Sequence, residues 1–343
     1  MAEERVMVLY NAPTLPVEHP DAAAERDVLH TVELVTGELR DAGFRVHLCG
    51  AGKEPDELLT ALRHFQPQAV FNLFEGLAIC GQTEAYAAGL LEWLGIPFTG
   101  CPMPAMVLAR DKILCKRLLK GADLPTPAFI TAQDGSLSEM PEAWPVIVKP
   151  VAEDASVGID YGSVVATPAA LAQRLRYLME HYQPPFLIEQ FIDGREFNVG
   201  ICDDPLPVVL PIAEIIFDRS VPGHWPIVTY QSKWNPGSEE DLAALPKCPA
   251  DVDPALAERL QHLALQAYHL IGCRDYARID VRVDAQGQPW ILEVNPNPDY
   301  GATSGLSRML SASGRSHRSM TVQMIQRCLQ LRNAANESPV VGL

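Results

Sequence analysis

The first 95 residues alternate between short apolar runs and amphipathic stretches, and this alternation restricts the fold more than any other feature. It predicts strands at 6–10, 44–48 and 69–73, and helices at 22–42, 58–65 and 83–94. Strand–helix alternation is typical of a parallel, doubly wound sheet with helices on its faces. Because such sheets bind ligands beyond the carboxyl ends of their strands, we expect the loops after Tyr10 and Leu73 to border a site.

The rest of the chain is less regular and predicts an α+β arrangement. A Pro- and Gly-rich stretch at 95–104 marks the first predicted domain boundary. Beyond it we expect helices at 105–119, 168–181, 254–271 and 320–332, and strands at 145–150, 163–166, 186–192, 196–201 and 207–217. The strands at 186–192 and 196–201 are predicted to pair antiparallel around Asp193-Gly194-Arg195. The long polar segment 217–247 is predicted to be an irregular lid.

The stretch 278–298 is predicted to be a β-hairpin. Its first strand alternates in period two, so that Arg278, Asp280 and Arg282 share one face. A turn centred on Gln286-Gly287 would place Asp280 opposite Glu293 on the second strand, and Arg278 opposite Asn295.

Asp280, Glu293 and Asn295 are therefore candidate metal ligands. Two carboxylates that close repel each other, and a hard divalent cation removes the conflict. Magnesium prefers such oxygen ligands and takes its others from water and phosphate. The alternative is a surface hairpin with solvated acids, and the hairpin alone leaves both interpretations open.

Charge and composition exclude several classes of partner. The 343-residue chain has 27 Lys and Arg against 43 Asp and Glu, a net charge of −16. This argues against nucleic acids and anionic membranes, which need a basic surface. The chain has no apolar run approaching the roughly 18–20 residues of a membrane span and no signal-peptide pattern at its start. Its eight cysteines are scattered, which favours reduced core cysteines in a cytoplasmic protein.

A second chemical stretch follows the predicted strand 145–150. Lys149 lies near the end of that strand, and Ser156 and Gly158 belong to a small-residue loop of the kind that approaches phosphate oxygens. Because the loop lacks the Walker spacing, an ordinary turn with a solvent-directed lysine remains the alternative. Three further charged residues are candidates for the same site, namely Lys112 at a helix start and the pair Glu189 and Glu196. The alternative for each of them is a solvated charge on the protein surface.

Taken together and in order, these stretches resemble the ATP-grasp enzymes, and within them the D-alanine–D-alanine ligase family. The matching segments are Ala24-Glu-Arg-Asp-Val28, Leu94-Gly-Ile-Pro-Phe-Thr-Gly100, Asp111-Lys112, Leu124-Pro-Thr-Pro127, Pro145-Val-Ile-Val-Lys-Pro150, Ser156-Val-Gly158, Ile188-Glu-Gln-Phe-Ile-Asp-Gly-Arg-Glu-Phe197, Ala277-Arg-Ile-Asp280 and Leu292-Glu-Val-Asn295. The resemblance implies an N-terminal doubly wound domain at 1–103 and two ATP-grasp lobes at 104–185 and 186–333. The lid at 217–247 belongs to the second lobe, and 334–343 would be a disordered tail.

The resemblance also implies a reaction and its residues. A carboxylate is phosphorylated by ATP, and an amine then displaces phosphate to leave an amide. In the nucleotide site, Lys112 and Lys149 match the phosphate lysines, and Ser156 matches a phosphate contact. The adenine-binding linker is matched by Glu189, Phe191 and Ile192, and the ribose ligand by Glu196. Lys233 matches the lid lysine, and Arg278 matches the arginine that stabilises the oxyanion. Asp280, Glu293 and Asn295 match the ligands of Mg²⁺, for which Mn²⁺ can substitute. A homodimer is also expected from the family.

The substrate positions depart from the family pattern. Glu25 matches the glutamate that holds the ammonium of the first D-alanine, but its usual serine and tyrosine partners are replaced by Ala155 and Trp234. Ser304 keeps the position that contacts the second substrate's carboxylate. We therefore expect small amino-acid or carboxylate substrates, with D-alanine alone a poor one. The alternatives are a specialised amino-acid ligase that uses another carboxylate and a nucleotide-binding protein without catalysis.

Overall fold

The computed structural model describes the chain except for residues 1–2, 17–21, 78–79, 134–135, 138, 152–155, 222 and 338–343. The described chain divides into two compact units. Unit 1 comprises Met1–Val107, Gly272–Tyr276 and Pro296–Leu343, and unit 2 comprises Leu108–Ile271 and Ala277–Asn295. The lobe boundaries expected from the sequence stay predictions.

Unit 1 is built on the parallel sheet that the sequence predicted. Its strands β1 (Arg5–Asn11), β2 (Arg45–Ala51) and β3 (Ala69–Leu73) lie in the order β2-β1-β3. Every residue of β3 is buried, as expected for a strand covered on both faces. The helices of this unit are α1 (Ala22–Asp41), α2 (Pro55–Phe65), α3 (Thr83–Trp93), α10 (Gly305–Ala312) and α11 (His317–Glu337).

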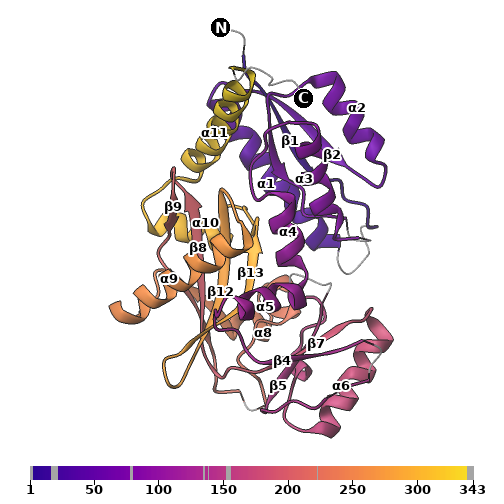
Figure 1. Ribbon diagram of the computed structural model, residues 1–343, viewed down its shortest axis with the longest axis vertical. Coiled ribbons are helices and arrows are strands. Elements are labelled where there is room, and N and C mark those ends of the chain that lie inside the picture. The colour runs from indigo at the N-terminus through magenta and orange to yellow at the C-terminus, as the bar shows by residue number, and fades with distance from the viewer. Residues whose placement is uncertain are drawn as a thin grey trace. The chain divides into compact units, whose positions relative to one another are not determined.

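The helices of unit 1 pack on this sheet through apolar stripes. The predicted stripe of α1, namely Val28, Val32, Val35 and Leu39, is buried, and α1 contacts β1, β2 and α11. In Figure 1 the C-terminal helix α11 lies beside the N-terminal elements of unit 1, and it contacts β3. The helix α4 (Met103–Arg110) then leads the chain into unit 2.

One sheet of unit 2 is antiparallel and carries Lys149 of the predicted site. Its order is β4-β7-β5-β6, from β4 (Phe129–Ala132), β5 (Val146–Pro150), β6 (Val164–Val165) and β7 (Phe186–Gln190). The helix α6 (Pro168–His181) lies beside β5 (Figure 1). Its Leu171, Leu175 and Leu178 join Val146, Val148 and Ile188 in one buried cluster.

A further sheet of unit 2 carries the predicted hairpin. It has the order β11-β10-β8-β12-β13, with β9 paired to β8, and its strands are β8 (Gly194–Asp203), β9 (Pro207–Val209), β10 (Ala213–Phe217), β11 (Ala244–Lys247), β12 (Tyr276–Asp284) and β13 (Pro289–Pro296). The helix α9 (Pro254–Ile271) packs on β8 and β9. The turn falls where it was predicted, since Gly287 N donates to Asp284 O at 3.0 Å.

The predicted antiparallel pair at 186–192 and 196–201 is wrong. The two segments become β7 and β8, which belong to different sheets, so the short link 191–193 carries the chain from one sheet to the next. Gly194 begins β8 where it passes β12 so closely that a Cβ would clash with the carbonyl of Val283. A short connection between two apolar strands looks like a hairpin in sequence, and only the neighbouring strands distinguish the two cases.

Other elements differ from expectation in detail. The predicted helix 105–119 is two helices, α4 and α5 (Lys112–Gly121), because Asp111 is extended and caps α5 through a bond from Leu114 N at 2.9 Å. The predicted strand 207–217 is likewise split into β9 and β10. The segment 217–247 is not irregular, since it contains α7 (Tyr230–Trp234), α8 (Glu239–Leu242) and β11. The closing helix α11 reaches Glu337, and the rest of the predicted tail lies outside the described residues.

Candidate active site

A buried charge cluster joins the two predicted ATP lysine regions in unit 2. Glu189, on β7, is 1% exposed, and Lys149 Nζ from β5 donates to its Oε1 at 2.6 Å. Its other oxygen pairs with Lys116, on α5, which is 2% exposed and also donates to Thr126 Oγ1 at 2.8 Å. Burial alone would raise the pKa of Glu189, but the two lysines hold it at about 2. Glu189 is therefore a fixed anion that orients Lys149.

The predicted metal set comes together on neighbouring strands. Asp280 on β12 accepts a bidentate pair of bonds from Arg278, both at 2.8 Å. Its Oδ1 also accepts from Asn198 Nδ2 on β8 at 2.7 Å, and its Oδ2 from Asn295 Nδ2 on β13 at 2.9 Å. The amide nitrogen of Asn295 therefore donates to Asp280, and its amide oxygen can bind a different partner. Arg278 and Asn295 also lie together, as predicted.

Glu293 lies beside Asp280 in this set. Its pKa is raised, first by burial and then by the negative charge of Asp280, while the positive charges of Lys112, Lys149 and Arg278 act in the opposite direction. Burial and the neighbouring Asp280 thus both oppose the ionisation of Glu293. The arrangement has two acids in conflict, with basic side chains from α5, β5 and β12 near them.

Glu196, the predicted ribose ligand, is held by an arginine to which the sequence assigned no role. Arg282 on β12 donates to Glu196 Oε2 from Nε at 2.9 Å and from Nη2 at 2.8 Å, and to the Ile192 carbonyl at 2.8 Å. Its guanidinium lies 4.8 Å from the ring centroid of Phe191. Because Phe191, Ile192 and Glu196 all contact Arg282, the residues predicted for adenine and ribose form one cluster.

The described part of the small-residue loop has an unusual backbone conformation. Ser156 has φ 64° and Gly158 has φ 76°, both in the left-handed region. A Cβ on Gly158 would lie 2.7 Å from the Pro150 side chain, so glycine is required there. Ala155, one of the departures from the family pattern, lies outside the described residues.

The lid residues are placed on a short helix. Lys233 and Trp234 belong to α7, which begins after Thr229, and the Lys233 ammonium lies 5.3 Å from the Trp234 ring centroid. Thr229 Oγ1 in turn bonds Glu240 on α8. The predicted lid segment therefore contains regular structure, and Lys233 lies on one of its helices.

Glu25, the substrate residue predicted in unit 1, is better supported than the sequence indicated. Its Oε2 accepts from Thr14 N at 2.9 Å and from Leu15 N at 2.8 Å, and its Oε1 accepts from Thr14 Oγ1 at 2.9 Å. Burial would raise the pKa of Glu25, but these bonds lower it below its usual value. The premise that Glu25 lacks hydrogen-bond partners is therefore wrong, because the loop after β1 supplies them.

Ser304, also in unit 1, caps a helix. It precedes α10, is 5% exposed, and accepts from Ser307 N at 3.1 Å. Its hydroxyl therefore lies at a helix N-terminus, where the backbone dipole favours a carboxylate.

Sequence reasoning missed Lys116, Asn198 and Arg282 as members of these clusters. Lys116 lies four residues after Lys112 on the same helix, a spacing that places both on one face. Asn198 shares a strand face with Glu196, and Arg282 shares one with Arg278 and Asp280. The periodicities were visible, but no pattern in the sequence identifies which neighbouring strand supplies the partner.

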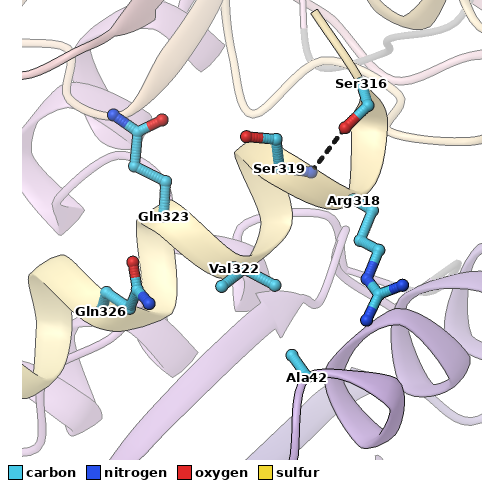
Figure 2. A pocket seen from close by; sticks show the side chains of 7 residues that line it. All are labelled: Ala42, Ser316, Arg318, Ser319, Val322, Gln323 and Gln326. Atoms are coloured by element: carbon cyan, nitrogen blue, oxygen red, sulfur yellow. Dashed lines mark hydrogen bonds between the residues drawn. The ribbon is translucent and has the colours of Figure 1, made fainter.

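A surface hollow in unit 1 is separate from all the predicted site residues. It has a volume of about 500 Å³ and is lined by Ala42, Ser316, Arg318, Ser319, Val322, Gln323 and Gln326. Figure 2 shows most of the lining side chains spaced along α11, with Ala42 at the end of a neighbouring helix and Ser319 N donating to Ser316 Oγ. Arg318 is the charged group of this lining, so the hollow offers no acid–base pair.

The described residues contain no group of three or more His, Cys, Asp and Glu side chains placed to hold a metal. A metal at the hairpin would therefore rely on two carboxylates and an amide. No helix in the described part of the chain is long and apolar enough to cross a membrane.

Known proteins resemble this chain over most of its length. A family model described as "D-ala D-ala ligase C-terminus" matches residues 118–326. The uncharacterized protein y4sG of Sinorhizobium fredii is 33% identical over 83% of each chain. The D-alanine–D-alanine ligase of Synechococcus sp. (strain JA-3-3Ab) is 30% identical over 92% of this chain and 95% of its own, and that of Bordetella avium is 34% identical over 88% and 90%.

A solved structure shares the fold. The D-alanine–D-alanine ligase from Bacillus anthracis complexed with ATP superposes with a TM-score of 0.75 at 20% identity, covering 97% of this chain and 99% of that one.

Proposed function

The chain belongs to the D-alanine–D-alanine ligase family of ATP-grasp enzymes, and on that basis we propose that it is an ATP-dependent ligase that joins two molecules of D-alanine. Enzymes of this class form a carbon–nitrogen bond at the expense of ATP. The relatives named D-alanine–D-alanine ligase cover most of both chains, which supports the same reaction here.

One observation in unit 2 carries the proposal. Two adjacent carboxylates, Asp280 and Glu293, face a set of cations that includes Lys112, Lys149 and Arg278. Neither group alone is unusual, but together they match what phosphoryl transfer needs: cations for the phosphate oxygens and carboxylates for a divalent metal.

The residues at the hairpin fit a divalent cation. The pKa of Glu293 is raised, because burial and Asp280 oppose its ionisation, and a cation between the two acids would relieve both causes. Asp280, Glu293 and the oxygen of Asn295 would hold Mg²⁺, or Mn²⁺ in its place. The metal would neutralise phosphate charge as a Lewis acid.

The residues proposed for ATP also form a coherent set in unit 2. Lys112, Lys149 and Ser156 would bind phosphate oxygens, the linker Phe191-Ile192 would bind adenine, and Glu196 would bind ribose. Lys149 is oriented for this by Glu189, which lies 2.6 Å away. Bound ATP supplies the phosphoryl group that makes the carboxylate of the first amino acid reactive towards an amine.

Other side chains would act on the amino acids. Arg278 would stabilise the oxyanion that develops when the amine attacks, and Lys233 would bring a further positive charge over the phosphates. The lid, residues 217–247, would exclude water, which otherwise hydrolyses an activated carboxylate. Glu25 would bind the ammonium of the first amino acid, and Ser304, at the start of α10, the carboxylate of the second.

The reason to doubt D-alanine is weakened by the structure. The doubt rested on Glu25 lacking support, yet Thr14 and Leu15 donate to both of its oxygens. A carboxylate held ionised in this way suits a small ammonium. The relatives do not favour a specialised ligase for another carboxylate, and Arg278, Lys233 and the metal set argue against a protein without catalysis. A cytoplasmic location and a homodimer remain proposals drawn from composition and family.

The test is phosphate release with MgATP and D-alanine, with the product identified by mass spectrometry. We expect D-alanyl-D-alanine and one ADP per dipeptide. D-alanine that releases no phosphate, in a protein that does so with another amino acid or carboxylic acid, would contradict the proposed substrate and leave the ligase class standing.

A further inference from the structure

Arg282 is the most heavily engaged charged side chain around the predicted nucleotide residues of unit 2, and it belongs to neither the metal set nor the phosphate set. It is 3% exposed, and its guanidinium donates to groups on separate segments. These are Glu196 on β8, the Ile192 carbonyl in the link between sheets, and the Pro226 carbonyl in the segment before α7. A side chain with this reach holds segments that lie far apart in sequence.

The geometry around the ring systems adds to this. The guanidinium lies 4.8 Å from the centroid of Phe191 and 5.5 Å from that of Phe217. Phe191 also meets Trp225 edge-on at 5.3 Å and belongs to an apolar cluster with Ile147. Arg282 therefore packs against the aromatic linker residue as well as bonding the next residue's carbonyl.

The bonds to Glu196 have a direction that bears on ligand binding. Nε and Nη2 of Arg282 both donate to the same carboxylate oxygen of Glu196, Oε2. Because a carboxylate oxygen has only two lone pairs, Oε2 is then saturated and the carboxylate plane is fixed. Oε1 is the oxygen that can accept from a ribose hydroxyl.

We propose that Arg282 is a positioning residue for the nucleoside part of ATP. It acts through Glu196 and the Phe191-Ile192 linker and ties them to the segment that leads into the helix of Lys233. It does not touch phosphate. The inference rests on the proposed function, since it needs the nucleotide to bind at these residues, but it concerns nucleotide affinity and not the identity of the amino acids.

The experiment compares Arg282→Met and Arg282→Lys with the matched control Arg195→Met. Arg195, the residue before Glu196, makes a bidentate pair with Glu214, at 2.6 and 2.7 Å, and its guanidinium lies 4.8 Å from the Phe197 centroid. Like Arg282 it pairs with a carboxylate and lies over an aromatic ring, but it does not bond the linker. Calorimetry measures the binding of MgADP, and competition measures the binding of adenosine and of inorganic tripolyphosphate.

We expect Arg282→Met to weaken MgADP and adenosine at least tenfold while tripolyphosphate binding stays within twofold. Arg282→Lys should lie between it and the wild type, because an ammonium keeps the charge but lacks the fork. Arg195→Met should bind every probe like the wild type. In turnover, Arg282→Met should raise KM for ATP and leave kcat at saturating ATP within threefold.

Equal loss of tripolyphosphate and adenosine binding would overturn the proposal, as would wild-type affinity in Arg282→Met or an equal effect of Arg195→Met. If Arg282→Met does not fold, Arg282→Lys carries the test, because it leaves Glu196 in place and keeps a positive charge beside it. It should show the same selective loss of nucleoside affinity to a smaller extent. Wild-type protein that binds MgADP but does not ligate D-alanine would refute the proposed substrate and leave this inference intact.

Discussion

Replacing Lys116 by methionine tests the buried charge cluster behind the nucleotide lysines. Glu189 is 1% exposed and is shared between Lys116 and Lys149. Methionine fills nearly the volume of a lysine stem, so the change removes the charge and its bonds with little change in packing. Glu189 is then left buried with Lys149 as its remaining cation in the cluster.

The size of the effect follows from the carboxylate. The lysines hold the pKa of Glu189 at about 2 instead of 4.5, which corresponds to about 3 kcal/mol at roughly 1.36 kcal/mol per pKa unit. Lys116 contributes more to this lowering than Lys149 does, so its loss removes most of the effect. The lost bond from Lys116 to Thr126 adds about 1 kcal/mol. We therefore expect Lys116→Met to lower the free energy of unfolding by about 3 kcal/mol.

The stability that Glu189 contributes depends on pH. Because the pKa of Glu189 is lowered on folding, its contribution is complete above pH 4.5 and is lost as the pH falls towards 2. Burial lowers the pKa of Lys116 in turn, which reduces the net contribution of the pair but not the cost of removing one partner. The double variant Lys116→Met/Glu189→Gln should lose less stability between pH 4.5 and 2 than the wild type.

The assay is urea unfolding followed by circular dichroism at pH 7, with Lys120→Met as the control. Lys120 lies one turn further along α5 and is exposed, so its replacement should change the unfolding free energy by no more than about 0.5 kcal/mol. A Lys116→Met protein as stable as Lys120→Met would show that the cluster contributes nothing, and that the pairing of Glu189 is not what holds Lys149 in place.

Three further changes test other parts of the site. Glu293→Gln should lower magnesium-dependent turnover at least about 100-fold and, since the pKa of Glu293 is raised in the folded protein, should stabilise the metal-free protein above pH 4.5; turnover like that of the wild type would remove the hairpin from catalysis. MgADP with D-alanine should slow proteolysis within 217–247, and cleavage at an unchanged rate would mean that this segment is not a lid. Thr14→Val should raise KM for D-alanine about tenfold, the loss of a bond to a charged group, while Thr14→Ser should not; equal KM values in the two variants would show that the Thr14 hydroxyl has no part in placing Glu25.

Local periodicity was enough to predict much of this fold, because each element hides one face. The parallel strands of unit 1, the stripe of α1 and the hairpin turn at Gly287 all lie where their patterns placed them. The same reasoning brought Asp280 and Asn295 together, since a hairpin fixes its own partners.

Contacts between elements that lie far apart in the chain could not be predicted from the sequence. The strands β7 and β8 were predicted to pair, yet they belong to different sheets, because strand propensity does not name a neighbour. Lys116 meets Glu189 across 73 positions of sequence, and Arg282 meets Glu196 across 86. Such partners are set by the order of strands in a sheet and by helix packing, and a linear motif contains neither.

The error over Glu25 shows how this limit affects a functional argument. Its family partners are replaced in the sequence, so the carboxylate looked unsupported, and a different substrate was inferred to compensate. An ionised carboxylate needs donors, however, and these can come from any neighbouring position. Backbone N–H groups are available from any loop, and here the turn after β1 presents Thr14 N and Leu15 N to one oxygen while the Thr14 hydroxyl reaches the other. The replacement of a side-chain partner therefore changes what the pocket wall is made of without changing the charge it offers. For this chain it follows that the loss of the two side-chain partners is no argument against a small ammonium, because the donors from Thr14 and Leu15 keep Glu25 ionised.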